Sequence, residues 1–348
     1  MAAQYTSVPI LRYTPMNCAG AAAAGGRTSQ CPRPGKTVQE MKNVDEYKRK
    51  SKLGDVESAL DLISDGMYVA FGGHVFFNKP SYFVRAMVKR GFKDLTISGS
   101  PYASYEFDLP IGAGMVKKVV AGNCGFEYMG FAPNFRKAAT TGSVEVAIGD
   151  EATIVGGYMA TVEGLPYHPI NSVKGSDVAK YSTLIKEYVG PFGDKLYACK
   201  AAHPDVVILH APQGDEYGNI RYYNSIFFER IMAKIGKKVI VTVDEIIPHH
   251  KVRSEPVKTM IPGFLISTII HAPYGAHPCQ STGQYAHDED HIKDYIDRGR
   301  ASASGANPQP FAEYLQKYCY EPKDIYDYID CAGGMRRMEE LRRKWIDG

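Results

Sequence analysis

The 348-residue chain lacks a long hydrophobic run. No apolar run approaches the roughly 20 residues that a membrane-spanning helix needs, so we expect a soluble protein that does not enter a membrane. The chain also lacks a large block of like charge, because 41 basic and 38 acidic residues give a formal net charge of +3. Neither nucleic acid nor an anionic membrane surface is therefore expected as a partner, which leaves small molecules and proteins.

Cysteine is sparse and arranged in no motif. The seven cysteines are scattered, odd in number and never spaced as CxxC. This pattern argues against a disulfide framework and a zinc ribbon, and it fits a reducing compartment. We expect a cytoplasmic location.

Several signature motifs are also missing. The chain contains no GxxxxGK[ST] phosphate loop and no internal repeat of 20 to 50 residues. The stretch from Gly112 begins like a dinucleotide fingerprint, but its third glycine is absent and a strand pattern follows. His287 and His291 flank three acidic residues without forming HExxH, which favours a solvated, hydrogen-bonded helix start. We therefore expect no metal and no permanently bound cofactor.

The first forty residues differ in composition from the rest. They are rich in Ala, Gly, Ser and Thr, and no acidic residue precedes Glu40. We expect residues 1–45 to form a disordered extension. Their basic, hydroxylated character also fits a transit peptide for organellar import, and a start at Met41 would make the segment a misplaced beginning.

Strand and helix patterns alternate from Asp65 to about residue 300. We expect strands over residues 68–71, 94–98, 115–120, 143–148, 205–210, 238–243 and 264–270. Helical patterns lie between several of them, over residues 82–90, 131–139 and 154–162. Short buried strands separated by helices predict a layered α/β domain with a mostly parallel sheet over residues 46–300. Only helical patterns follow in residues 301–348, which predicts a helical C-terminal tail.

The most informative segment is DGMYVAFGGHVFFNKP, Asp65 to Pro80. Its unalternating apolar run suits a parallel strand that is covered on both faces. Gly72 and Gly73 follow and allow positive φ or a close backbone approach. Ser81 could then cap a helix. Taken alone, the glycines favour a plain tight turn.

Two other loops leave predicted strands with polar and glycine residues. HAPQGDEYGNIRY begins at His210, and IIHAPYGAHPCQSTGQY presents His277 and Gln280. The first could be an ordinary hairpin turn. Together with the glycine pair, the loops at these strand ends predict one composite site.

The Asp65–Pro80 segment resembles the signature of the A-type subunits of family I CoA-transferases. The signature reads Asp-Gly, two residues, three apolar residues, Gly-Gly, an aromatic residue and a later proline; His74 stands here where phenylalanine is usual. The course from about Val56 to Trp345 is similar to the α subunit of glutaconate CoA-transferases. The most specific matches are VTVDEII, residues 241–247, and APYGAHP, residues 272–278.

The resemblance implies a two-subunit enzyme that moves CoA between carboxylic acids through a glutamyl-CoA thioester. In this family the nucleophilic glutamate belongs to the B-type subunit, where Asn-Gly usually follows it. This chain contains no Glu-Asn-Gly, so the resemblance places the nucleophile in a B-type partner. The CoA thioester would be a substrate, and a dicarboxylyl-CoA such as glutaconyl-CoA is the expected acyl donor.

This chain would then supply the other wall of the site. The backbone N–H groups of Gly72 and Gly73 could hold a developing oxyanion. In some relatives an asparagine two residues past the proline shares that role, where this chain has Tyr82. The expected substrate-binding residues are Gly72, Gly73, His74, Asn78, Ser98, Ser100, His277 and Gln280.

Glu151 supports an alternative within the same fold. In ring-opening hydrolases of steroid-derived CoA thioesters, a glutamate at the equivalent point acts as the base, and a decarboxylase could use the same position. The arginine of that branch is Asn171 here. Asp150 and Glu151 also suit a helix N-terminus, which is the simpler explanation. A non-enzymatic domain that senses a metabolite ranks last, because no helix-turn-helix pattern or basic stripe is evident.

Overall fold

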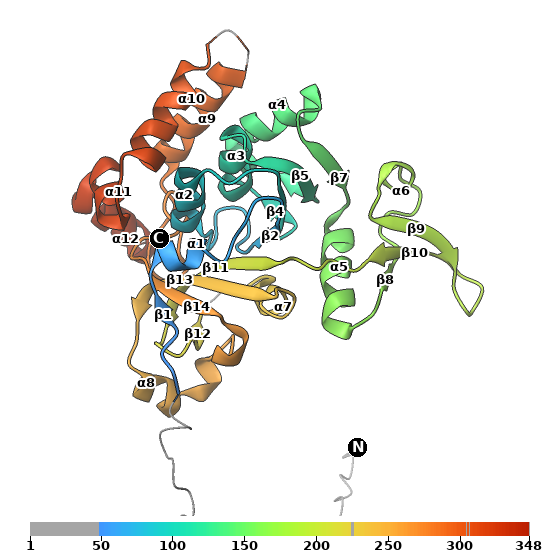
Figure 1. Ribbon diagram of the computed structural model, residues 1–348, viewed down its shortest axis with the longest axis horizontal. Coiled ribbons are helices and arrows are strands. Elements are labelled where there is room, and N and C mark those ends of the chain that lie inside the picture. Colours follow the sequence, from blue (N-terminus) through green and yellow to red (C-terminus); the bar gives the residue numbers. More distant parts are fainter. Residues whose placement is uncertain (1–48, 224–225, 304, 306, 348) are drawn as a thin grey trace, which may run out of the picture. The chain divides into compact units, whose positions relative to one another are not determined.

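The computed structural model describes residues 49–347 except residues 224, 225, 304 and 306 (Figure 1). The extension predicted over residues 1–45 lies outside the described residues. Within the described part, no helix combines the length and the apolar character needed to cross a membrane.

A nine-stranded, mostly parallel sheet forms the centre of the described residues. Its order is β1-β14-β13-β11-β2-β3-β5-β7, with every neighbouring pair parallel, and β12 pairs antiparallel with β11. This arrangement confirms the predicted fold class. The strands are β1 (Leu53–Gly54), β2 (Tyr68–Phe71), β3 (Leu95–Gly99), β5 (Val116–Ala121), β7 (Glu145–Ile148), β11 (Val206–Gly214), β12 (Ile220–Arg221), β13 (Lys238–Ile246) and β14 (Thr268–His271).

The inner strands are apolar without alternation because both of their faces are buried. In β2, Val69 and Phe71 join the hydrophobic core on one face, whereas Ala70 joins the core on the other. Ile208 and Leu209 of β11 divide between the same two cores. A continuous apolar run, which a half-exposed strand would not have, therefore indicates a strand at the centre of the sheet.

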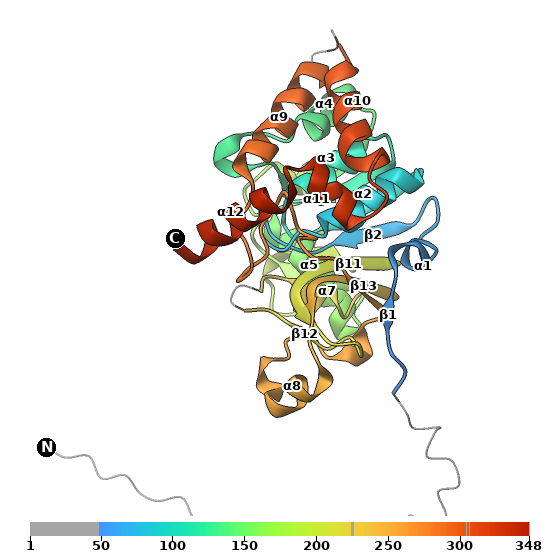
Figure 2. The same ribbon diagram turned by 90° about the vertical axis from the view of Figure 1, so that its left-hand side faces the viewer.

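Helices cover both faces of the sheet (Figures 1 and 2). One core contains side chains of α1 (Val56–Leu60), α2 (Ser81–Arg90), α3 (Tyr105–Gly112), α4 (Pro133–Thr141) and the C-terminal helices α9 (Glu289–Ala303), α10 (Gln309–Leu315), α11 (Ile325–Cys331) and α12 (Gly334–Asp347). The opposite core contains side chains of α5 (Glu151–Glu163) and α7 (Glu229–Met232). The predicted helical tail is thus part of the packing on the α2 face.

Smaller elements complete the described chain. An antiparallel sheet has the order β8 (Tyr167–Ile170), β10 (Lys195–Lys200), β9 (Ile185–Val189) and carries the short helix α6 (Val178–Tyr181). The strands β4 (Tyr102–Ala103) and β6 (Asn123–Cys124) pair in parallel, and α8 (His249–Ser254) follows β13. The sequence patterns did not predict these elements.

Three local predictions were wrong in detail. Residues 264–270 do not form one strand, because a single 3-10 turn, Gly263–Leu265, precedes β14. Ser81 does not cap α2; Pro80 is the N-cap residue, and the Ser81 hydroxyl donates to the carbonyl oxygen of Ala276 at 2.8 Å. The start of α9 is hydrogen-bonded as expected, because Asp288 accepts two hydrogen bonds from Arg337, but Asp288 is buried rather than solvated.

The order of the strands creates a switch point between β2 and β11. After β2 the chain adds β3, β5 and β7 on one side, and it then returns to place β11, β13 and β14 on the other. In open α/β sheets, ligands bind outside the carboxyl ends of the strands at such a point. The Gly72-Gly73 pair follows β2 directly at this position.

Candidate functional site at the carboxyl edge of the sheet

Both glycines of the pair are required by close packing. The N–H of Gly72 donates to the carbonyl oxygen of Ile208 at 2.9 Å, which continues the contact between β2 and β11. A Cβ at Gly72 would lie 2.5 Å from Cδ2 of Leu209. Gly73 has a φ of +83°, and a Cβ there would lie 2.4 Å from the carbonyl oxygen of Phe77. The pair lets the loop fold back tightly over the end of the sheet.

The loop from His74 to Asn78 is held by backbone hydrogen bonds. His74 and Phe77 exchange two N–H to carbonyl bonds of 2.9 and 2.8 Å. The N–H of Asn78 donates to the carbonyl oxygen of Gln280 at 2.8 Å. The N–H of Gln280 in turn donates to the carbonyl oxygen of Phe76 at 2.7 Å. Two of the predicted site residues, Asn78 and Gln280, are therefore brought together by the fold.

Backbone strain marks the same loop. Val75 and Asn78 have φ values of 48° and 51°, in the left-handed region that a β-branched residue such as valine rarely adopts. Asn78 is fully buried, and its side-chain oxygen accepts from the N–H of Thr282 at 3.0 Å. Strained backbone of this kind persists where the surroundings over-determine it, and it is frequent in functional sites.

His74 is a half-buried residue at the start of this loop. Its ring stacks on Phe227, with centroids 4.5 Å apart and 22° between the planes, and Nδ1 lies 3.3 Å from the hydroxyl oxygen of Ser100. Burial, aided by the positive charge of Lys79, lowers the pKa of His74 to about 4. The imidazole is therefore neutral at pH 7 and can donate or accept one hydrogen bond at each nitrogen.

A buried ion pair supports the underside of the loop. Nζ of Lys79 lies 2.6 Å from Oε1 of Glu106 in α3, and both side chains have no exposed surface. The Lys79 ammonium also donates to the carbonyl oxygen of Tyr102 at 3.2 Å. Sequence reasoning missed this pair, although Lys79 lies inside the segment that it singled out.

A second missed residue is Glu229 at the start of α7. Its carboxyl is buried, and Oε2 accepts from the N–H of Phe227 at 2.7 Å. Oε1 has no hydrogen-bond partner among the residues that the structure describes. Burial raises the pKa of Glu229, and the nearby N–H groups of Phe227 and Gly73 oppose that rise. No motif pointed to Glu229, because only the fold brings it to Gly73.

The third loop is fixed by Asp244 at the carboxyl end of β13. One Asp244 oxygen lies 3.1 Å from Nε2 of His210, and it also accepts from the Ser281 hydroxyl. The other accepts from the Tyr285 hydroxyl at 3.3 Å. Asp244 thus ties the loop that carries Gln280 to the ends of β11 and β13, which gives the VTVDEII segment a structural role.

Two predicted site residues lie away from the loop. The fully buried hydroxyl of Ser98 accepts from the Tyr158 hydroxyl at 3.0 Å, on the face that α5 covers. His277 is also fully buried. Its Nδ1 lies 2.7 Å from the hydroxyl oxygen of Tyr328, and its Nε2 lies 3.2 Å from a carboxylate oxygen of Asp288. Neither side chain opens toward the switch point, so a direct contact of these two residues with a substrate stays a prediction.

Glu151 lies at the same edge of the sheet, but it follows β7, which is distant from β2. It is exposed in the first turn of α5, directly after Asp150, whose side chain caps that helix. Three strand spacings separate β7 from β2, or about 14 Å. Among the described residues, no group of three or more His, Cys, Asp and Glu side chains could hold a metal ion.

Known proteins share this architecture. The A-type chain of glutaconate CoA-transferase from Acidaminococcus fermentans is 29% identical to this chain, over 82% of this chain and 93% of that one. The crystal structure of glutaconate CoA-transferase from the same organism matches with a TM-score of 0.77 at 27% identity, covering 84% of this chain and 96% of the matched chain.

Two further relatives broaden the comparison. A protein of Archaeoglobus fulgidus is 33% identical over 82% of this chain, and the match spans 63% of that protein's length. The cholesterol ring-cleaving hydrolase IpdA subunit of Rhodococcus jostii is 26% identical over 80% of this chain and 95% of that protein. The family model described as coenzyme A transferase matches residues 54–272, which is more than half of the chain. The chain therefore belongs to the coenzyme A transferase family.

Proposed function

We propose that this chain is the A-type subunit of a two-subunit enzyme that moves CoA from an acyl-CoA to a carboxylic acid. One observation carries the proposal: the strained Gly72-Gly73 loop lies at the switch point of a coenzyme A transferase fold, yet the chain contains no Glu-Asn-Gly. The chain thus supplies one wall of a site whose nucleophile comes from a B-type partner.

The chemistry proceeds by exchange at carbonyl carbons. The partner's glutamate attacks the thioester carbonyl, the C–S bond breaks, and an acyl-glutamyl anhydride and CoA thiolate form. The thiolate then attacks the glutamyl carbonyl, which releases the first carboxylate and leaves a glutamyl-CoA thioester. A second carboxylate reverses these steps and departs as the new acyl-CoA. CoA is a substrate throughout, and no permanent cofactor takes part.

The described residues would contribute rigidity and hydrogen-bond donors to this site. The N–H of Gly72 is used within the sheet and that of Gly73 lies near the Glu229 carboxyl, so the His74 ring is the group of this junction that we assign to the substrate side. The backbone bonds between Asn78 and Gln280 hold the loop before substrate arrives. Such preorganisation is the main way in which an enzyme stabilises a developing oxyanion.

We further propose a short dicarboxylyl-CoA, such as glutaconyl-CoA, as the acyl donor. The similarity to glutaconate CoA-transferase over most of both chains supports this choice. The neutral His74 ring can donate a hydrogen bond to the distal carboxylate of such a substrate.

The test is an assay of the copurified complex. The complex of this chain with the B-type partner is incubated with glutaconyl-CoA and acetate, and the products are separated by liquid chromatography. We expect acetyl-CoA, together with inactivation by hydroxylamine only after acyl-CoA has been added, because hydroxylamine cleaves the glutamyl-CoA thioester. Free CoA without acetyl-CoA would overturn the transferase proposal.

A second candidate is hydrolysis or decarboxylation of a CoA thioester with Glu151 as the base. The similarity to the ring-cleaving hydrolase supports it, as does the position of Glu151 at the carboxyl edge of the sheet. Glu151→Gln separates the two candidates. Transfer should be nearly unchanged if Glu151 only opens α5, whereas hydrolysis should fall by roughly a hundredfold or more if Glu151 is the base.

A further inference from the structure

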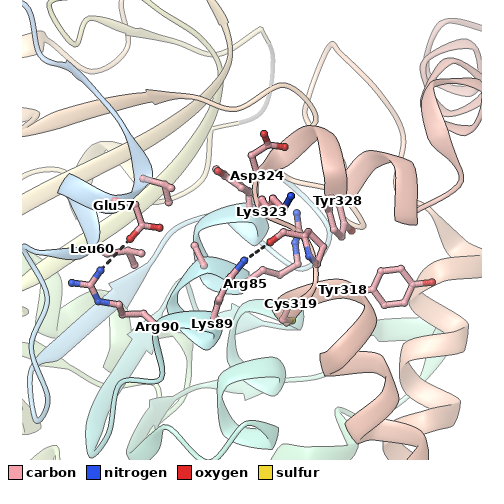
Figure 3. Close-up of a pocket in the computed structure, with 14 residues that line it drawn as sticks. Glu57, Leu60, Arg85, Lys89, Arg90, Tyr318, Cys319, Lys323, Asp324 and Tyr328 are labelled. Carbon is pink, nitrogen blue, oxygen red and sulfur yellow. Dashed lines mark hydrogen bonds and ion pairs between the residues drawn. The ribbon is translucent and has the colours of Figure 1, made fainter.

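A pocket lies beside α2, between α1 and the segment from Tyr318 to Tyr328 (Figure 3). Its volume is about 230 Å³. Residues of α1 and of α2, the latter from Tyr82 to Arg90, form one side, and the segment from Tyr318 to Tyr328 forms the other. The pocket therefore joins the α/β domain to the C-terminal helices, and nothing in the proposed transfer reaction uses it.

Positive charge is in excess around this pocket. Four basic side chains line it, namely Arg85, Lys89, Arg90 and Lys323, against the acidic side chains of Glu57 and Asp324. Arg90 is paired with Glu57 at 3.1 Å. The Asp324 carboxylate caps α11 by accepting backbone N–H bonds at 2.8 and 3.0 Å. Arg85, Lys89 and Lys323 form no ion pair with any residue that the structure describes.

Arg85 is the least compensated of these cations. Its side chain is only 3% exposed, and one terminal nitrogen has no hydrogen-bond partner among the described residues. The other donates to the carbonyl oxygen of His277 at 2.7 Å, and the guanidinium carbon lies 3.4 Å from the centre of the Tyr328 ring. A buried charge without a counter-ion is costly, and neither a carbonyl dipole nor an aromatic ring supplies a full negative charge.

Lys89 brings a second cation to the rim of the pocket. Its ammonium donates to the carbonyl oxygen of Pro322 at 2.6 Å, directly before Lys323 in the chain. In Figure 3 the side chains of Lys89, Arg85 and Lys323 lie in the same part of the pocket. Each ammonium has three donors, and Lys89 has used one of them here.

We propose that this pocket binds a small oxyanion, the carboxylate or phosphoryl group of a metabolite. Lys89 and Lys323 donate hydrogen bonds to the oxyanion, and the buried charge of Arg85 adds a Coulomb attraction. An anion bound here would contact both α2 and the Tyr318–Tyr328 segment, and it would strengthen the contact between them. The volume fits a phosphate or a four-carbon dicarboxylate better than a nucleotide.

The test measures binding rather than activity, so it does not depend on the proposed function. The full-length chain, with any partner that copurifies, is titrated calorimetrically with sodium phosphate and with sodium succinate. Sodium chloride at matched ionic strength controls for screening. The variants are Lys89→Met and Lys323→Met, and the matched control is Lys186→Met, an exposed lysine of β9 outside the pocket.

We expect saturable binding of at least one of the two probes. Each pocket variant should weaken it by roughly tenfold to a hundredfold, the loss expected for one charge-assisted hydrogen bond. Lys186→Met should bind like the parent. Tighter binding of phosphate would identify a phosphoryl ligand, and tighter binding of succinate a carboxylate. The proposal is overturned if neither probe saturates, if sodium chloride reproduces the heat, or if all three variants bind alike.

Discussion

At the scale of single residues, Gly73 is the position with the least freedom. Its φ of +83° lies in the left-handed region, and the space of its missing Cβ is bounded by the carbonyl oxygens of Phe77 and Asn78 at 2.4 and 2.7 Å. Backbone atoms of a bonded loop cannot move aside as a flexible side chain can. A side chain at Gly73 would therefore displace the loop that carries His74.

An alanine in the left-handed region costs about 1 kcal/mol through its φ alone. Gly73→Ala should lower the free energy of unfolding by more than this amount. Gly142→Ala is the matched control, because Gly142 has a φ of +69° but nothing within 4 Å of a Cβ. Urea unfolding of both variants measures the difference. Equal losses would show that the loop around Gly73 yields more easily than its hydrogen bonds indicate.

His74 predicts a pH dependence of stability. Its folded pKa of about 4 lies below the ordinary value of 6.5, so between these values the unfolded chain binds more protons than the folded one. The contribution to stability is complete above about pH 6.5 and is lost as pH falls toward 4. His74→Phe, which introduces the residue usual in the family, should make the free energy of unfolding less dependent on pH in this window.

Urea unfolding of the parent and of His74→Phe at pH 4.5 and pH 7 checks this prediction. Other groups titrate equally in both proteins. The change in unfolding free energy between the two pH values, compared between parent and variant, therefore gives the contribution of His74. An identical fall in both proteins would mean that His74 is not desolvated by Phe227 in solution.

At the scale of elements, the Lys79–Glu106 pair joins the glycine loop to α3. Removing one partner leaves a buried charge without compensation, and Lys79→Met should cost about 3–5 kcal/mol of unfolding free energy. Lys79→Met combined with Glu106→Leu should recover much of that loss, because neither charge of this pair then remains buried. The exposed pair Lys180–Asp177 serves as the control, and Lys180→Met should change stability by less than about 1 kcal/mol.

Chemical denaturation of the three variants gives these values. If the double variant is no more stable than Lys79→Met, packing rather than charge governs this contact.

The same scale shows which elements the sequence could predict. The strands β2, β11 and β13 were recognisable because both faces are buried, which leaves continuous apolar runs such as Val206 to Leu209. The strands β8, β9 and β10 were missed because they are partly exposed, and residues such as Lys186 and Glu187 interrupt their apolar pattern.

The site was predictable to a similar extent. The glycine pair and the Asn78–Gln280 contact follow from loops at strand ends, which parallel topology brings to one edge. Glu229 and Phe227 could not be found in this way, because nothing in their own spacing places them beside the glycine loop, which comes far earlier in the chain. Ser98 and His277 are polar residues near strand ends, yet the packing of α5 and of the C-terminal helices covers them.

At the scale of the whole molecule, we propose that this chain provides one wall of the site and that a B-type partner provides the nucleophile. The strand order places the Gly72-Gly73 loop at the switch point, and the chain belongs to the coenzyme A transferase family. Because this chain has no Glu-Asn-Gly, we propose that the glutamyl-CoA thioester forms on the partner.

Mass spectrometry of the intact proteins tests this claim most directly. The purified complex is incubated with the acyl-CoA in the absence of an acceptor acid, and both proteins are weighed. We predict that the B-type partner gains the mass of CoA less one water, because the thioester sulfur replaces a carboxyl oxygen of the glutamate. We also predict an unchanged mass for this chain and no CoA transfer by this chain alone. A CoA adduct on this chain, or transfer without the partner, would contradict the account.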